Sequence, residues 1–60
     1  MNLLEHYIVK IISEEKMQHD GVEYCRVNMI VDCYGAEEET EQLFPLKEWQ
    51  KAKGQGYYMA

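Results

Sequence analysis

Histidines and cysteines are the residues of this sequence best suited to metal binding or nucleophilic chemistry, and their spacing favours neither. The 60 residues contain no CxxC, HxxxH or HxxE motif, although short spacings of this kind are typical of metal sites. Cys25 and Cys33 lie in one expected strand, about 26 Å apart at about 3.3 Å per residue. They are too distant to share a metal or to form a disulfide with each other. We expect no metal site, with His19 a polar turn residue. We interpret both cysteines as small buried hydrophobic residues, with an intermolecular disulfide as the alternative.

Catalysis is not expected either. A thiol nucleophile needs a histidine and an orienting acid beside it, and no local element places them next to Cys25 or Cys33. Gly54 and Gly56 follow an expected helix instead of opening one, which does not fit a phosphate-binding loop. A domain of this size has little room for the pocket of about 300 Å³ or more that small-molecule sites usually occupy. The sequence therefore predicts a protein that is not an enzyme, with no catalytic residues and no cofactor.

The element that fixes the centre of the fold is the alternating stretch of residues 22–34. A period of two predicts a strand with one face in the core. One face carries Cys25, Val27, Met29, Val31 and Cys33, and the other carries Tyr24, Arg26, Asn28, Ile30, Asp32 and Tyr34. We expect the first face to meet a helix through Trp49. The second face has tyrosines around a polar middle, and it is where we expect a partner to bind.

Two further strands are expected on either side of this one in the sequence. Residues 3–13 are rich in β-branched side chains and predict a first strand, with Tyr7, Val9 and Ile11 on one face. Their apolar spacing also fits a helix, which is the alternative. Residues 13–21 predict a polar turn that ends in Asp20-Gly21, a pair suited to a tight antiparallel hairpin. Gly35 ends the central strand, and residues 37–44 predict a third, glutamate-rich strand suited to a sheet edge.

The C-terminal quarter predicts a helix and a tail. Pro45 suits the first turn of a helix of eight or nine residues, and Gly54 suits its left-handed cap. Residues 57–60 form either a last short strand or a hook that docks on the core. The predicted fold is a single α+β domain over residues 1–60: a three-stranded antiparallel meander followed by a short C-terminal helix on one face, with a short extra C-terminal strand as the variant.

Charge and aromatic content point to a protein partner. Eleven acidic and six basic residues give a formal net charge of −5, which argues against direct binding to nucleic-acid phosphates. The acidic run of residues 37–41 either solvates an edge strand or engages a basic groove in the place of phosphates. One short helix covers only part of one sheet face, and the aromatic residues left over suit an interface. The expected contact residues are Tyr24, Arg26, Tyr34, Glu37, Glu38, Glu39, Glu41, Tyr57 and Tyr58.

Small size also favours association. A chain of this length buries only about 60% of the surface that its unfolded form exposes, so it often relies on a partner subunit. We expect a two-fold homodimer, and the alternative is a monomer whose Tyr57-Tyr58 tail wraps over the open face. Residues 1–10 contain no positive leader followed by an apolar run, and no uncharged stretch approaches the roughly 18 residues needed to span a bilayer. We expect a cytoplasmic protein with reduced thiols and no membrane partner.

Three stretches resemble small uncharacterised accessory proteins carried by phages and prophages of Gram-positive bacteria. They are Leu4-Glu5-His6-Tyr7-Ile8-Val9, Asp32-Cys33-Tyr34-Gly35, and Glu48-Trp49-Gln50-Lys51-Ala52-Lys53 running into Gly56-Tyr57-Tyr58-Met59-Ala60. The similarity spans most of the chain. That group has no assigned activity, so the resemblance implies a setting and no functional residue. It implies a short protein that binds and blocks a host protein, including effectors of antiviral defence.

Three hypotheses follow from these observations. The first is an interaction module that inhibits a host defence protein, as anti-CRISPR proteins do, or another nucleic-acid-handling protein, through an acidic and aromatic surface. The second is a structural, assembly or regulatory phage component that acts through its own oligomer. The third is a nucleic-acid-binding regulator that uses Lys47, Lys51 and Lys53. A salt-sensitive gel shift would identify the third.

Overall fold

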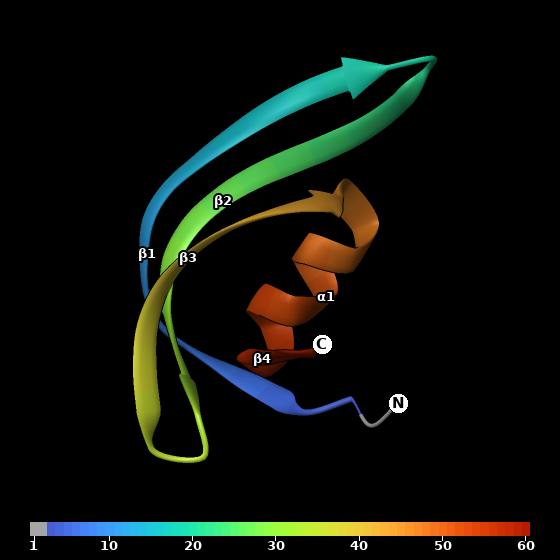
Figure 1. The fold of residues 1–60 in the computed structure, drawn as a ribbon. Helices are drawn as coiled ribbons and strands as arrows, with labels where there is room; N and C mark the ends of the chain where they lie inside the picture. Colours follow the sequence, from blue (N-terminus) through green and yellow to red (C-terminus); the bar gives the residue numbers. More distant parts are fainter. Residues whose placement is uncertain (1–2) are drawn as a thin grey trace.

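The computed structural model describes residues 3–60, which form a curved four-stranded antiparallel sheet around one short helix (Figure 1). The elements are β1 (Glu5–His19), β2 (Val22–Cys33), β3 (Ala36–Pro45), α1 (Leu46–Gln55) and β4 (Tyr57–Met59). The strand order is β3-β2-β1-β4. The predicted α+β meander with a C-terminal helix is confirmed, and the fourth strand, which was the variant, is present. Met1 and Asn2, which the leader expectation included, lie outside the described residues.

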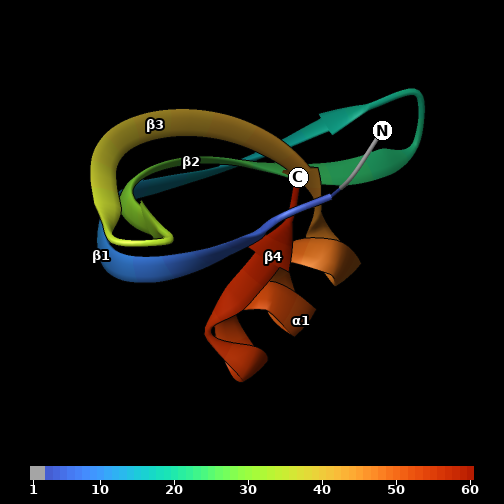
Figure 2. The same ribbon diagram turned by 60° about the horizontal axis from the view of Figure 1, so that its bottom comes forward.

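The sheet curls so that α1 lies on its concave side, while the β1–β2 hairpin projects past the start of the helix (Figures 1 and 2). Within residues 3–60, no helix has the length and apolar character needed to cross a membrane.

Two tight turns set the register of the meander. Asp20 and Gly21 have φ angles of 51° and 76°, and Tyr34 and Gly35 have 52° and 88°. Positive φ at both central residues is typical of the two-residue turns that match the twist of a hairpin. The predicted Asp20-Gly21 turn is confirmed, but the polar turn over residues 13–21 was wrong, because β1 continues to His19. Residues 13–19 are mostly polar, because Glu14 bonds to Trp49 and Lys53 at the margin of the core and the end of the hairpin extends beyond the start of the helix.

Two irregularities in the β1–β2 register decide which side chains of β1 enter the core. They fall at Val9 and Ile12, each of which is an extra residue relative to β2. Bulges of this kind interrupt the alternation of side chains. Ile8 and Ile11 therefore both pack against the core, opposite Val31 and Met29 of β2. The prediction that Val9 and Ile11 share a face was wrong, and Val9 and Ile12 are exposed.

The core lies between the concave side of β2 and one side of α1. Its buried residues are Cys25, Val27, Met29, Val31, Trp49, Ala52 and Tyr58, with Ile8, Ile11, Phe44 and Leu46 packed against them. The predicted contact of the alternating strand with Trp49 is confirmed. Phe44 stacks on Trp49 with 5.3 Å between ring centroids and meets Tyr58 edge-on at 5.1 Å. Three aromatic rings from β3, α1 and β4 thus close one side of the core.

The helix cap lies two residues beyond its predicted position. Pro45, predicted in the first turn, is the N-cap residue immediately before it. Gly56, with φ 88°, is the left-handed cap, and its N–H donates to the Ala52 carbonyl oxygen at 2.7 Å. The assignment of the cap to Gly54 was wrong, because Gly54 lies inside the last turn of α1. The tail then turns back so that Tyr57, Tyr58 and Met59 pair with the first residues of β1.

Candidate protein-binding face

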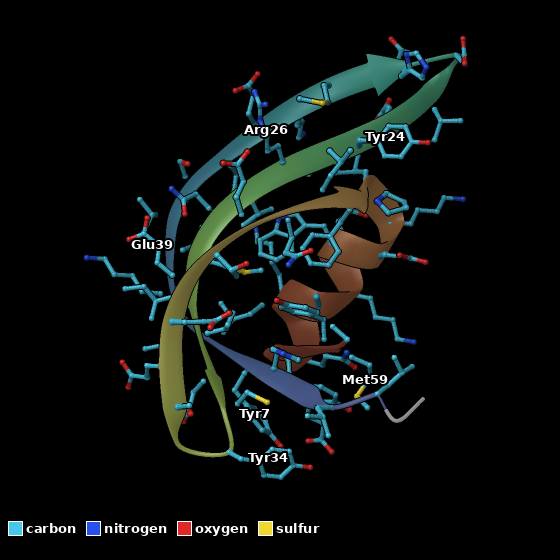
Figure 3. The ribbon with its side chains drawn as sticks, in the orientation of Figure 1. Tyr7, Tyr24, Arg26, Tyr34, Glu39 and Met59 are labelled. Atoms are coloured by element: carbon cyan, nitrogen blue, oxygen red, sulfur yellow. The ribbon has the colours of Figure 1, made fainter. Side chains whose placement is uncertain are left out.

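The sheet face turned away from α1, which we call the convex face, gathers most of the predicted contact residues. Even-numbered residues of β2 point to it, because the odd-numbered ones are buried against the helix. Figure 3 shows Arg26 and Glu39 on the side of the sheet away from α1. The predicted contact residues that the register places on this face are Tyr24, Arg26, Glu37, Glu39, Glu41 and Tyr57.

Arg26 lies between carboxylates from both neighbouring strands. Its Nη2 donates to Glu15 Oε2 of β1 at 3.2 Å, and its Nε lies 3.7 Å from Glu41 Oε1 of β3. Ser13 and Asn28 complete the lining of a shallow hollow of about 280 Å³ around this triad. One positive charge is thus shared by two negative ones, and the centre of the convex face stays acidic.

A second hollow lies toward the β2–β3 turn, where Tyr7 and Tyr34 come near each other (Figure 3). It has about 310 Å³ and is lined by Glu5, Tyr7, Asp32, Tyr34 and Gly35. The Tyr7 hydroxyl donates to the Glu5 carboxylate, and this hydrogen bond raises the pKa of Tyr7. Asp32 Oδ1 is buried and has no hydrogen-bond partner among the described residues. Because a buried acceptor without a partner is costly, this hollow favours a ligand group that donates hydrogen bonds.

Apolar side chains are exposed beside both hollows. Leu43 is 55% exposed next to Arg26 in the register, and Tyr34 is 80% exposed at the turn. Tyr7 packs against Tyr57 with 5.6 Å between ring centroids, and it remains half exposed. The convex face therefore combines acidic groups with aromatic and aliphatic surface, a combination suited to contact with another protein.

Two predicted contact residues lie elsewhere. Tyr58 is 8% exposed and belongs to the core, where burial raises its pKa, so it presents little surface to a partner. Glu38 is exposed but lies opposite the buried Val31, on the concave side of the edge strand β3. Sequence reasoning missed Glu15 because it fell within the predicted turn. Continuation of the Asp20-Gly21 hairpin backward along β1 was the signal that could have placed Glu15 opposite Arg26.

The remaining polar constellation has a structural role. Trp49 Nε1 donates to Glu14 Oε1 at 2.6 Å, and Lys53 Nζ lies 3.2 Å from the same oxygen. These contacts join β1 to α1. The Trp49 hydrogen bond, and after it Lys53, lower the pKa of the Glu14 carboxyl, against the opposing effect of partial burial.

The histidines and cysteines are the residues that the sequence offers for metal binding or nucleophilic chemistry. In the part of the chain that the structure describes, no group of three or more histidine, cysteine or acidic side chains could hold a metal ion. Both cysteines are free thiols, Cys25 being buried and Cys33 partly exposed. No protein-family model, no curated protein and no solved structure matches this chain.

Proposed function

We propose that this chain is a non-enzymatic protein-binding module whose convex face contacts a basic surface of another protein. The observation that carries the proposal is the convex face itself. No element within residues 3–60 covers it. It surrounds Arg26 with acidic groups beside the exposed Leu43, and it exposes Tyr34 and Tyr7 toward the other end of β2. Exposed apolar surface rimmed by charge is typical of protein interaction sites.

Charge defines the partner. Glu15 and Glu41 already share Arg26, whereas Glu37 and Glu39 have no ion-pair partner among the described residues. Together with the net charge of −5, these free carboxylates favour association with a positively charged surface and speed the encounter. Asp32 Oδ1, a buried acceptor in the second hollow, suits a donor such as a lysine or arginine side chain.

A nucleic-acid-handling protein, including an effector of antiviral defence, offers a surface of this kind. Its binding groove is basic because it holds phosphates. Carboxylates on β3 that occupy such a groove would compete with nucleic acid, and the chain would act as an inhibitor. The resemblance to phage-borne accessory proteins supports this class of partner over other basic proteins.

The test compares two neighbouring glutamates that point to opposite faces of the same strand. Immobilised wild-type chain, Glu39→Lys and Glu38→Lys are used to capture proteins from a lysate of a Gram-positive bacterium. Both variants change the net charge by the same amount, but only Glu39 lies on the convex face. We expect a specific protein on the wild-type and Glu38→Lys columns that elutes as ionic strength rises. Its affinity for Glu39→Lys should fall about tenfold or more.

The captured protein then gives the functional readout. We expect its binding to DNA or RNA to be inhibited by the wild-type chain and by Glu38→Lys, and spared by Glu39→Lys. Equal capture by the two variants would refute the convex face as the binding surface. Capture of no specific protein would refute the inhibitor hypothesis.

A further inference from the structure

One edge of the sheet is open over most of the length of β1. In the described chain, β4 pairs with β1 only from Glu5 to Tyr7, and Ile8 N–H donates to the Gly56 carbonyl oxygen at 2.9 Å. From Val9 to His19 no strand of residues 3–60 lies beside β1 on that side. Figure 1 shows this part of β1 at the outer rim of the projecting hairpin. An open edge is a template for pairing with another strand.

The tight turn determines which backbone groups this edge presents. His19 and Val22 flank the two-residue turn, so they exchange backbone hydrogen bonds. Because bonded and non-bonded residues alternate along an antiparallel pair, Glu14, Lys16 and Gln18 direct their N–H and C=O groups away from β2. The bulges at Val9 and Ile12 lie outside this stretch. Residues 13–19 thus form a regular edge with free donors and acceptors.

A second copy of β1 matches this edge in one register better than in the others. Two antiparallel copies related by a two-fold axis place residues of the same face opposite each other. An axis at Glu14 or Lys16 puts like charges opposite each other and brings no pair of opposite charge together to offset them. An axis at Met17 puts Glu14 beside Asp20. An axis at Glu15 places Glu14 of each copy opposite Lys16 of the other, which makes two pairs of opposite charge. The Glu14 carboxylate also keeps its contacts with Trp49 and Lys53 of its own chain.

We propose that the chain forms a two-fold homodimer in which the open edges of β1 pair antiparallel, centred on Glu15. The sheet then runs continuously from β3 of one protomer to β3 of the other. The hairpin turn of each protomer reaches the region of Val9 and Lys10 of the other, where β4 begins to cover the edge. This inference goes beyond the proposed function, and since it uses the strand edge and not the convex face, the two can fail separately.

One contact in this register is unfavourable, and it gives a prediction that belongs to this register. The two copies of Glu15 meet on the convex face, where like charges directly opposite each other are destabilising. Each Glu15 is held by its own Arg26 at 3.2 Å, which offsets part of the repulsion. Removal of the Glu15 charge should therefore strengthen the dimer, although it removes an ion pair within each protomer.

Sedimentation velocity over about 1 μM to about 1 mM tests the dimer in a range that covers weak and moderate association. We expect a monomer–dimer equilibrium for the wild type. Lys16→Glu should raise the dissociation constant about tenfold or more, because both charge pairs become repulsive. Lys51→Glu, which makes the same charge change at an exposed position of α1 away from this edge, should leave the dissociation constant within about threefold. Glu15→Gln should lower the dissociation constant of the dimer, because it removes the repulsion between the two Glu15 side chains.

A backbone variant separates edge pairing from charge. The chain is short enough for chemical synthesis with an N-methyl group on the Lys16 amide, whose N–H points away from β2. We expect this variant to keep the far-ultraviolet circular dichroism of the wild type and to stay monomeric. A wild type that is monomeric throughout, equal effects of Lys16→Glu and Lys51→Glu, a dimer that survives N-methylation, or assemblies larger than a dimer would each overturn the proposal.

Discussion

The link between β1 and α1 yields a stability prediction of defined size. Trp49 is 1% exposed, and its indole N–H donates to Glu14 at 2.6 Å. Glu14→Ala leaves this buried donor without a partner, which costs about 1–3 kcal/mol. A 60-residue domain has a free energy of unfolding of about 3–9 kcal/mol at the usual value per residue. Loss of one side chain on a projecting strand should therefore remove a large part of the stability.

Two comparison variants separate the hydrogen bond from the ion pair. Glu14→Gln keeps an oxygen that can accept from Trp49 and loses the charge, so we expect a cost of about 0.5–1.5 kcal/mol. Lys53→Gln removes the ammonium group that lies 3.2 Å from the Glu14 carboxylate, and the Lys53 side chain is 44% exposed. An ion pair this exposed contributes less than about 1 kcal/mol. The expected order of destabilisation is Glu14→Ala, then Glu14→Gln, then Lys53→Gln.

Urea unfolding followed by far-ultraviolet circular dichroism measures these differences. With a slope of about 1 kcal/mol per M for a small domain, the midpoint of Glu14→Ala should fall by about 1–3 M. The fluorescence of Trp49, the one tryptophan in the sequence, reports on the helix in the same samples. If Glu14→Ala costs no more than Lys53→Gln, the indole hydrogen bond does not hold the helix to β1, and the reasoning is refuted.

Three further predictions concern single residues. The pKa of Glu14 is lowered in the folded state, so the Glu14 carboxylate stabilises the fold above pH 4.5, its usual pKa, and this stabilisation is lost as the pH falls through the folded-state pKa. The free energy of unfolding of Glu14→Gln should therefore fall less steeply with decreasing pH than that of the wild type. Identical pH profiles would contradict this. Gly56→Ala should destabilise the protein by about 1 kcal/mol, because Gly56 has φ 88°. Gly54→Ala should stabilise it by about 0.5–1 kcal/mol, because Gly54 lies inside the helix with open space for a Cβ. Thermal melts measure both changes, and the opposite signs would show that the helix ends at Gly54. Tyr34→Asn should stabilise by about 0.5–1 kcal/mol, because Tyr34 has φ 52° and asparagine tolerates this conformation better; chemical denaturation that shows a loss would mean that Tyr34 contributes packing.

The strands whose apolar residues meet the core could be predicted from the sequence. The period of two over residues 22–34 corresponds to β2, because its odd-numbered residues pack on Trp49 while its even-numbered ones face outward. The second half of β1 carries no such pattern, since Glu14 contacts α1 through a hydrogen bond to Trp49 and the end of the hairpin extends beyond the start of the helix. Its strand structure follows from backbone pairing to β2, which leaves little trace in residue type.

The bulges explain the ambiguity between strand and helix in the first segment. Ile8 and Ile11 reach the same side of the sheet at a three-residue spacing, because the bulge at Val9 adds one residue between them. That spacing resembles one face of a helix. The convex face could be predicted in part, because alternation along β2 identifies Tyr24 and Arg26. Its acidic partners from β1 depend on where a turn begins, and residue type fixes that position poorly.

The pairing of β4 with the start of β1 has a consequence for the order of folding. The two hairpins of the meander join neighbours in the sequence, whereas Tyr58 pairs with His6 across almost the whole described chain. Contacts between distant residues carry the larger closure entropy and tend to form after local ones. We expect β1, β2 and β3 to pair first, with Phe44 uncovered on one side until Tyr58 arrives. During synthesis, completion of the core therefore waits until residues 57–59 have left the ribosome.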